Sequence, residues 1–155
     1  AIVASDRDPR FLNSITFRKE NILLVISPEH PLAKMETVTL KEVSRVPLIM
    51  REEGSGTRRI VMEAFRNKGL VPTVLYEASN LEFTKELIGR GEGASFIVEP
   101  VVQKELAQGL LKKLTVSDVK LSMDAYIVFL NRNDLSRIAT SFIDMLVNRP
   151  DQAVH

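Results

Sequence analysis

A glycine-rich turn, Gly54-Ser55-Gly56-Thr57-Arg58, is the feature of the sequence best suited to chemistry. It follows an expected strand over residues 47–50 and opens an expected helix over residues 57–68. Two glycines allow a sharp turn and a close approach of a ligand to the backbone. The first turn of a helix offers unpaired N–H groups at a positive dipole end, which suits a carboxylate, a sulfate or a phosphate. The side chains that could contact such an anion are Ser55, Thr57, Arg51 and Arg58.

A second interpretation of this turn stays open from the residues alone. It is an ordinary strand-to-helix loop, in which Ser55 or Thr57 does no more than cap the helix. Two nucleotide-binding motifs are excluded. No Lys follows the second glycine as a P-loop requires, and Arg59 stands where a G-x-G-x-x-G fingerprint needs its third glycine.

Ser79-Asn80 marks a second helix start that follows an expected strand. Such turns line the ligand crevice of open α/β sheets, so Asn80 is a further ligand candidate. The alternative is a plain capping box, because Ser79 and Glu82 have the required spacing.

Groups for catalysis or metal binding are scarce. The histidines are His30 and His155, and the absence of cysteine excludes thiolate catalysis, disulfides and Cys-based zinc sites. Glu52-Glu53 could form a paired-carboxylate site, but solvated loop acids, or a Glu52 that balances Arg51, explain them as well. We therefore expect no enzyme activity, no catalytic residue, no metal and no cofactor.

The composition indicates a folded globular chain that has no dedicated nucleic-acid surface. The 155 residues suit one domain or two small lobes, and 45% hydrophobic with 26% charged residues is ordinary for globular proteins. The net charge is +1, without the clustered basic excess of a nucleic-acid-binding domain. No apolar run is long enough to span a bilayer, and no signal peptide is visible. Because Ala1-Ile2-Val3 resembles the end of a strand without its beginning, we expect a fragment of a longer protein.

Strands that alternate with helices predict an α/β fold with largely parallel sheets. The unbroken apolar run over residues 22–26 suits a strand covered on both faces. A last helix is expected from an Asp134 cap through Val147. The residues expected on its buried face are Leu135, Ile138, Phe142, Met145 and Leu146.

Taken in order, these features resemble the effector-binding (regulatory) domain of LysR-type bacterial transcriptional regulators. The resemblance covers nearly the whole chain, and its order and spacing make it specific. The most telling segments are His30-Pro31-Leu32-Ala33 and the stretch from Arg51 to Arg58. The other matching segments are Ala1-Ile2-Val3, residues 24–29, 38–43, 47–50, 91–98 and 106–111, and the strand and helix that end in Phe142-Ile143.

The resemblance implies a two-lobed periplasmic-binding-protein-like fold with mostly parallel sheets and an incomplete first lobe. Lobe I would comprise residues 1–33 and 127–155, and lobe II residues 34–126. Effectors of this family bind between the lobes. The resemblance then assigns Ser55, Gly56 and Thr57 as anion ligands, through hydroxyls and backbone N–H groups, with Ser5 acting from the opposite lobe. Arg51 and Asn80 are the weaker candidates.

The implied function is a ligand-sensing domain of a cytoplasmic LysR-type DNA-binding regulator. It would bind a small anionic effector between its lobes and couple binding to the geometry of a homodimer or homotetramer, with no membrane partner. DNA contact would come only from the helix-turn-helix that is absent from this sequence, as is the first part of lobe I. The alternative is a periplasmic-type solute-binding protein or an enzyme on the same scaffold, because a fold does not fix a function.

Overall fold

The structure is a computed structural model that describes residues 2–5, 13–131, 133 and 135–147. The chain divides into two compact units. Unit 1 consists of Ala1–Lys19 and Met123–His155, and unit 2 consists of Glu20–Ser122. The lobe boundaries expected at residues 33/34 and 126/127 stay a prediction.

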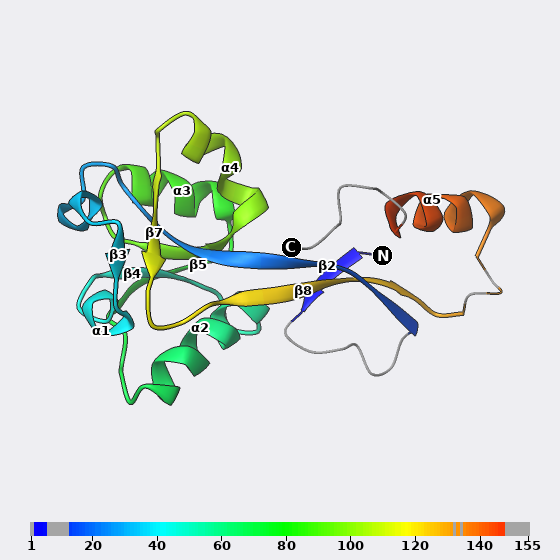
Figure 1. Ribbon diagram of the computed structural model, residues 1–155, viewed down its shortest axis with the longest axis horizontal. Helices are drawn as coiled ribbons and strands as arrows, with labels where there is room; N and C mark the ends of the chain where they lie inside the picture. Colours follow the sequence, from blue (N-terminus) through cyan, green and yellow to red (C-terminus); the bar gives the residue numbers. More distant parts are fainter. Residues whose placement is uncertain (1, 6–12, 132, 134, 148–155) are drawn as a thin grey trace. The chain divides into compact units, whose positions relative to one another are not determined.

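Unit 2 follows the expected alternation of strands and helices (Figure 1). The strand β2 enters it and the strand β8 leaves it, and both are longer than the sequence indicated. A short 3-10 helix (Pro31–Lys34) follows β2. The elements in chain order are β2 (Asn13–Ile26), β3 (Thr37–Val38), α1 (Leu40–Val43), β4 (Leu48–Arg51), α2 (Gly56–Asn67), β5 (Val74–Ala78), α3 (Leu81–Gly89), β6 (Ser95–Val98), α4 (Glu99–Ala107), β7 (Lys112–Val116) and β8 (Ser122–Phe129).

Strand pairing in unit 2 is mixed, which corrects the expectation of mostly parallel sheets. The pairs β3–β7 and β4–β5 are parallel, whereas β2 pairs antiparallel with both β6 and β7. Leu24 of β2 lies opposite Phe96 on one side and Leu114 on the other. The α4 crossover keeps β6 and β7 parallel to each other, as a helical connection should. The strand between them comes from unit 1 and runs the opposite way.

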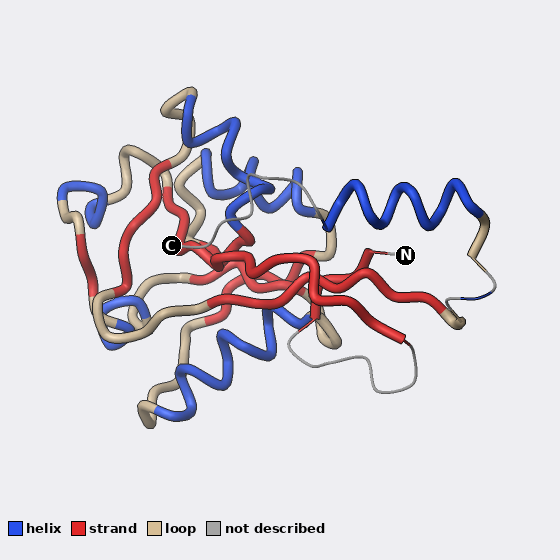
Figure 2. Tube along the Cα trace, turned by 45° about the vertical axis from the view of Figure 1, so that its right-hand side comes forward, coloured by secondary structure: helices blue, strands red, loops and turns tan. Residues whose placement is uncertain are grey.

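The core of unit 2 forms where helices cover these strands on both sides (Figure 2). The apolar run of β2 is part of it, since Val25 and Ile26 are fully buried. The α2 helix buries the apolar side chains Val61, Ala64 and Phe65. The Phe65 ring meets Phe96 edge-on, with centroids 6.2 Å apart. This packing fixes α2, and therefore the turn that opens it, against the sheet.

A close backbone approach at Gly93 aligns β4 with the start of β6. A Cβ atom at position 93 would lie 2.6 Å from the carbonyl oxygen of Pro47. Without one, Ala94 N–H donates to Pro47 O at 2.9 Å, and Ile49 N–H donates to Ala94 O at 2.8 Å. Glycine at this position therefore brings β4 and its following turn alongside the rest of the unit.

Unit 1 contains β1 (Ile2–Ser5), which pairs antiparallel with β8, and the helix α5 (Arg137–Val147). The helix is present as expected, but the prediction of its buried face is wrong at three positions. Ile138, Phe142 and Met145 are 83%, 51% and 50% exposed, whereas Ile143 is buried. Phe142, Ile143 and Leu146 of this helix line a cavity together with Ile2 and residues 127–129. The expected cap Asp134 lies outside the described residues, and the hydroxyl of Ser136 accepts from Ala139 N–H at 3.1 Å.

Candidate functional site

The predicted strand–turn–helix around Ser55 is present. The strand β4 ends at Arg51, Gly54 takes a positive φ of 90°, and α2 begins at Gly56. Ser55 occupies the N-cap position, but its side chain makes no capping hydrogen bond. Its N–H donates to Glu52 O at 3.2 Å, and its carbonyl accepts from Arg59 N–H at 3.1 Å. Of the two interpretations of this turn, simple capping by the Ser55 hydroxyl is therefore not what the structure contains.

Thr57 differs from Ser55 in its exposure. Its residue is only 7% exposed, while Ser55 and Gly56 are half-buried. A ligand at this turn would meet the Ser55 hydroxyl and the backbone of the first helical turn more readily than the Thr57 side chain.

Arg51 is held by the residue that follows it. Its Nε and Nη2 atoms donate to the two carboxylate oxygens of Glu52 at 2.8 and 2.7 Å. The hydrogen bond from Arg51 lowers the pKa of Glu52 to about 2, and the same contact raises the pKa of Arg51. Glu52 therefore balances Arg51, which was one of the sequence-based interpretations of this acid. An anion that used Arg51 would have to replace Glu52.

Arg58 makes a different connection. Its Nη1 atom donates to the carbonyl oxygen of Arg51 and to Oε2 of Glu77, both at 2.7 Å. Arg51 ends β4, Arg58 lies in the first turn of α2, and Glu77 belongs to β5. One guanidinium group thus joins three elements around the glycine turn. No sequence signal pointed to Glu77, which lies 19 positions from Arg58.

A cavity of about 360 Å³ opens beside the turn and along the outer side of α2. Its wall includes Ser55, the carboxylate of Glu53 and three arginines, of which Arg58 is ion-paired with Glu77. The excess of positive charge favours an anionic guest. Gly56 and Thr57 are not part of that wall. The lining residues are Glu53, Gly54, Ser55, Arg58, Arg59, Met62 and Arg66.

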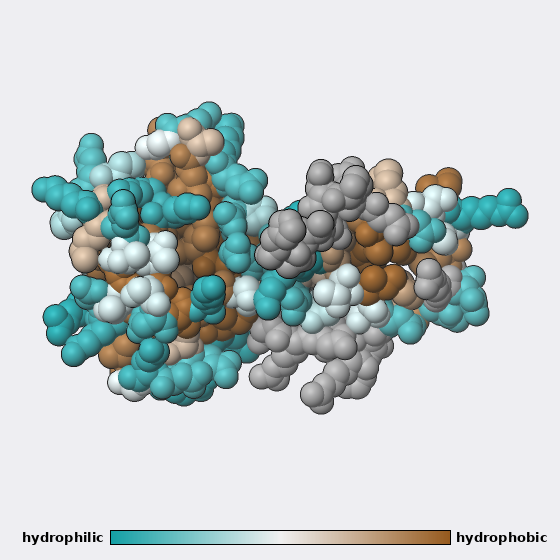
Figure 3. All heavy atoms as spheres, in the orientation of Figure 1, coloured by the Kyte–Doolittle hydropathy of each residue, from teal (hydrophilic) through white to brown (hydrophobic). Residues whose placement is uncertain are grey.

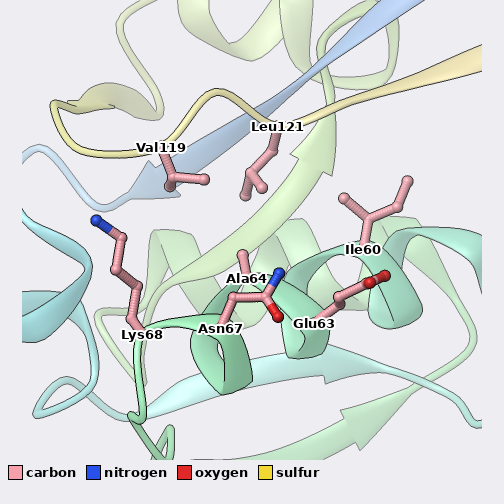
Figure 4. A pocket seen from close by; sticks show the side chains of 7 residues that line it. All are labelled: Ile60, Glu63, Ala64, Asn67, Lys68, Val119 and Leu121. Carbon is pink, nitrogen blue, oxygen red and sulfur yellow. The ribbon is translucent and has the colours of Figure 1, made fainter.

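A second cavity, of about 270 Å³, lies between α2 and the segment that leads into β8 (Figure 4). Apolar side chains come from both walls, and three polar side chains stand on the α2 side. Lys68 is paired with Asp118 at 3.2 Å. On the face of unit 2 seen in Figure 3, apolar residues form a band bordered by hydrophilic ones. The residues lining this cavity are Ile60, Glu63, Ala64, Asn67, Lys68, Val119 and Leu121.

Asn80 serves as the cap of α3. Its Oδ1 atom accepts from Glu82 N–H at 2.9 Å and from Phe83 N–H at 3.1 Å. The capping-box prediction was therefore right about a cap but wrong about the residue, since Ser79 was expected to supply it. With Oδ1 occupied, the Asn80 amide nitrogen is the group left to meet a ligand.

Ser5 belongs to unit 1, where it ends β1 opposite Asp124 of β8. The other five candidates, Arg51, Ser55, Gly56, Thr57 and Asn80, belong to unit 2. The structure therefore groups these five in one unit, and a shared site with Ser5 stays a prediction.

His30 has a structural role, and the described residues contain no cluster suited to a metal ion. The Nδ1 atom of His30 accepts from Leu32 N–H at 3.1 Å and caps the 3-10 helix, and burial lowers the pKa of this imidazole. Within the described ranges, no three His, Cys, Asp or Glu side chains gather into a possible metal site. In the same ranges, no helix is long and apolar enough to cross a membrane.

Comparison with known proteins decides the family. A family model described as the LysR substrate binding domain matches residues 1–151. The chain belongs to this family. The match confirms the resemblance seen in the sequence and, with the structural neighbours below, the α/β two-lobed fold class.

Curated relatives of this LysR-family domain include transcription factors. The HTH-type transcriptional activator CmpR of Synechocystis is 34% identical over 143 residues, which are 92% of this chain and 47% of CmpR. The RuBisCO operon transcriptional regulator of Acidithiobacillus ferrooxidans is 26% identical over 140 residues, 89% of this chain and 45% of that protein. The chain thus spans about half the length of the curated relatives it matches.

Solved structures similar to this LysR-family domain include regulatory domains. The Synechocystis PCC6803 CcmR regulatory domain in complex with 2-PG has a TM-score of 0.83 and 27% identity, and the similarity covers 94% of this chain and 70% of CcmR. The effector binding domain of QuiR in complex with shikimate has a TM-score of 0.84, covering 99% of this chain and 72% of QuiR. At 18% identity, the second likeness shows the fold alone.

Proposed function

We propose that this chain is the ligand-sensing domain of a LysR-type transcriptional regulator that responds to a small anionic effector. Three observations support the proposal: the family, relatives named as transcriptional regulators, and similar domains solved with 2-PG or shikimate. A ligand of this kind shifts a conformational equilibrium only through its different affinities for the two states. We therefore place the effector between two lobes, where it would favour one lobe arrangement and so change the geometry of the oligomer.

The observation that carries the site is the unused capping position of Ser55. Its side chain makes no capping hydrogen bond at the start of α2, and Ser55 lines a cavity that arginines also line. In the proposal, Ser55, Gly56 and Thr57 bind the anion from lobe II, residues 34–126. Ser5 acts from lobe I, residues 1–33 and 127–155. Arg51 and Asn80 contribute less, because Glu52 and the α3 backbone already engage them.

The full-length regulator would also bind DNA and other copies of itself. DNA would be bound by a helix-turn-helix outside this sequence, in the cytoplasm, and the protein would work as a homodimer or homotetramer without a catalytic step. Five large apolar side chains between residues 71 and 83 are 41–85% exposed, and we propose that β5 and its flanking segments contact another copy. These residues are Val71, Val74, Leu75, Tyr76 and Phe83.

A thermal-shift screen of the full-length regulator tests the ligand class. The panel would contain carboxylates, phosphate esters, sulfate and shikimate, each organic acid paired with its uncharged methyl ester. A ligand at 100 times its Kd stabilises the folded protein by about 2.7 kcal/mol, which raises the melting temperature by several degrees. We expect such a rise for acids and none for their esters. Equal shifts for acids and esters, or no shift with any acid, would contradict the proposal.

A further inference from the structure

We infer that Arg58 is a positioning residue for the proposed anion site, one that holds the glycine turn in its binding geometry instead of contacting the anion. The inference rests on the proposed function, because it names how that site is kept in shape. It assigns Arg58 a different role from the anion partner that its charge alone suggested.

The first contact of Arg58 links the two ends of the glycine turn. Its Nη1 atom reaches back to the carbonyl oxygen of Arg51, seven residues earlier, at 2.7 Å. The backbone enclosed by this contact is the stretch 52–57, which contains Ser55 and Gly56. Within the loop, Ser55 N–H also donates to Glu52 O, at 3.2 Å.

The second contact ties the same nitrogen to the sheet. Oε2 of Glu77 in β5 lies 2.7 Å from Nη1, and the Arg58 side chain is only 20% exposed. A guanidinium held by a carboxylate and a carbonyl has a fixed orientation, since hydrogen bonds with a charged partner are the stronger ones. Glu77 also balances the positive charge, which makes Arg58 a poor primary ligand for a second anion.

The composition of the turn makes it flexible without the two Arg58 contacts, which together we call the brace. Gly54, with φ of 90°, has more accessible backbone conformations than any other residue type. The Ser55 side chain makes no bond that would fix the helix start. Binding to an unbraced turn would carry the entropy cost of ordering it, whereas a preorganised turn avoids that cost.

The test uses Arg58→Met in the full-length protein, which keeps the apolar stem and removes the donor. The first readout is amide hydrogen exchange over residues 52–57 without ligand, expected to be several-fold faster in the variant. The second is affinity for shikimate, 2-PG and inorganic sulfate, expected to fall about fivefold or more, as for a lost net hydrogen bond of about 1 kcal/mol. The loss should be similar for all three probes, because a positioning residue does not read ligand charge.

Two further variants make the outcome specific. Arg66→Met removes a guanidinium from the same helix and the same cavity wall but makes neither contact, so exchange over residues 52–57 should not change. Glu77→Gln keeps an acceptor for Arg58 and removes the balancing charge. Under a positioning role the neutral amide holds Arg58 less strongly, so the affinity stays at or below that of wild type. Under a direct ligand role it would raise affinity, most for the most highly charged probe.

Different results would contradict the positioning role of Arg58 and the anion site itself. Unchanged exchange over residues 52–57 in Arg58→Met overturns the positioning role, whatever ligand binds. A loss of affinity that grows with ligand charge, or a gain in Glu77→Gln, also overturns it. If Ser55→Ala with Thr57→Ala leaves affinity unaltered while Arg58→Met speeds exchange, the brace stands and the anion site is wrong.

Discussion

The bidentate contact between Arg51 and Glu52 determines how much positive charge the glycine turn presents. The hydrogen bond from Arg51 lowers the pKa of Glu52 from an ordinary 4.5 to about 2, so Glu52 stays ionised well below neutral pH. Since the folded-state pKa is the lower one, the stability from this pair is present above pH 4.5 and is lost as the pH falls toward 2. Near neutral pH the pair is fully formed, and Arg51 is engaged by an internal anion.

Glu52→Gln should therefore strengthen anion binding near neutral pH. The amide leaves the Arg51 charge unbalanced, and a ligand no longer competes with a carboxylate on the same guanidinium. We expect affinity for shikimate or 2-PG to rise several-fold, measured by isothermal titration. Glu36→Gln is the matched control, because Glu36 is exposed and lines neither cavity beside α2. Affinity in Glu52→Gln that equals or falls below that of wild type would show that Arg51 plays no part in binding.

At the scale of elements, the approach of β4 to the start of β6 depends on Gly93. Gly93→Ala would place a Cβ atom 2.6 Å from the Pro47 carbonyl oxygen, so the backbone must shift. We expect the free energy of unfolding to fall by about 1–3 kcal/mol, as for other overpacked sites.

Gly89→Ala is the control for this prediction. Gly89 ends α3, and a Cβ atom there would meet nothing within 4 Å. This substitution should be neutral or stabilising by about 0.5–1 kcal/mol, because alanine loses less conformational entropy in a helix. Urea unfolding of both variants measures the difference. Equal stabilities would contradict the role assigned to Gly93.

The sequence predicted which segments form helices and strands, but not which strands pair or which helix faces are covered. The strand and the helix expected on either side of the glycine turn correspond to β4 and α2, because glycine has a strong local conformational preference. The apolar run at 22–26 indicated burial, but it contained no information that β2 would insert between β6 and β7. The amphipathic pattern of α5 likewise predicted an apolar face but not how much of that face would be covered.

For the candidate site, the sequence likewise predicted the position of the turn but not the contacts of its side chains. Local rules located the turn around Ser55, since strand, glycines and helix are contiguous in the sequence. The pairing of Arg58 with Glu77 and the choice of Asn80 over Ser79 as cap depend on tertiary placement and on competition between adjacent polar residues. Neither leaves a sequence signal that spacing rules can detect.

At the scale of the whole molecule, the exposed apolar residues between 71 and 83 predict self-association. The β5 strand pairs with β4, and its side chains at 74–76 are 41–50% exposed. Leu75→Glu should lower the molar mass of the full-length protein in light scattering, because a buried charge without a partner is costly at an interface. Met35→Glu is the control, as Met35 is 39% exposed but apart from this group in the sequence. A monomeric wild-type protein would contradict the proposed oligomer.

The central claim is that the turn at residues 54–58 binds the effector's anion. Isothermal titration of the full-length regulator with its best acid from the thermal-shift screen tests it most directly, in wild type and in Ser55→Ala with Thr57→Ala. Ser141→Ala, an exposed hydroxyl on α5, is the control. We predict at least about tenfold weaker binding in the double variant, which corresponds to a loss of about 1.4 kcal/mol of binding free energy. The control should bind with the wild-type affinity. Wild-type affinity in a double variant that melts at the wild-type temperature would show that the anion binds elsewhere.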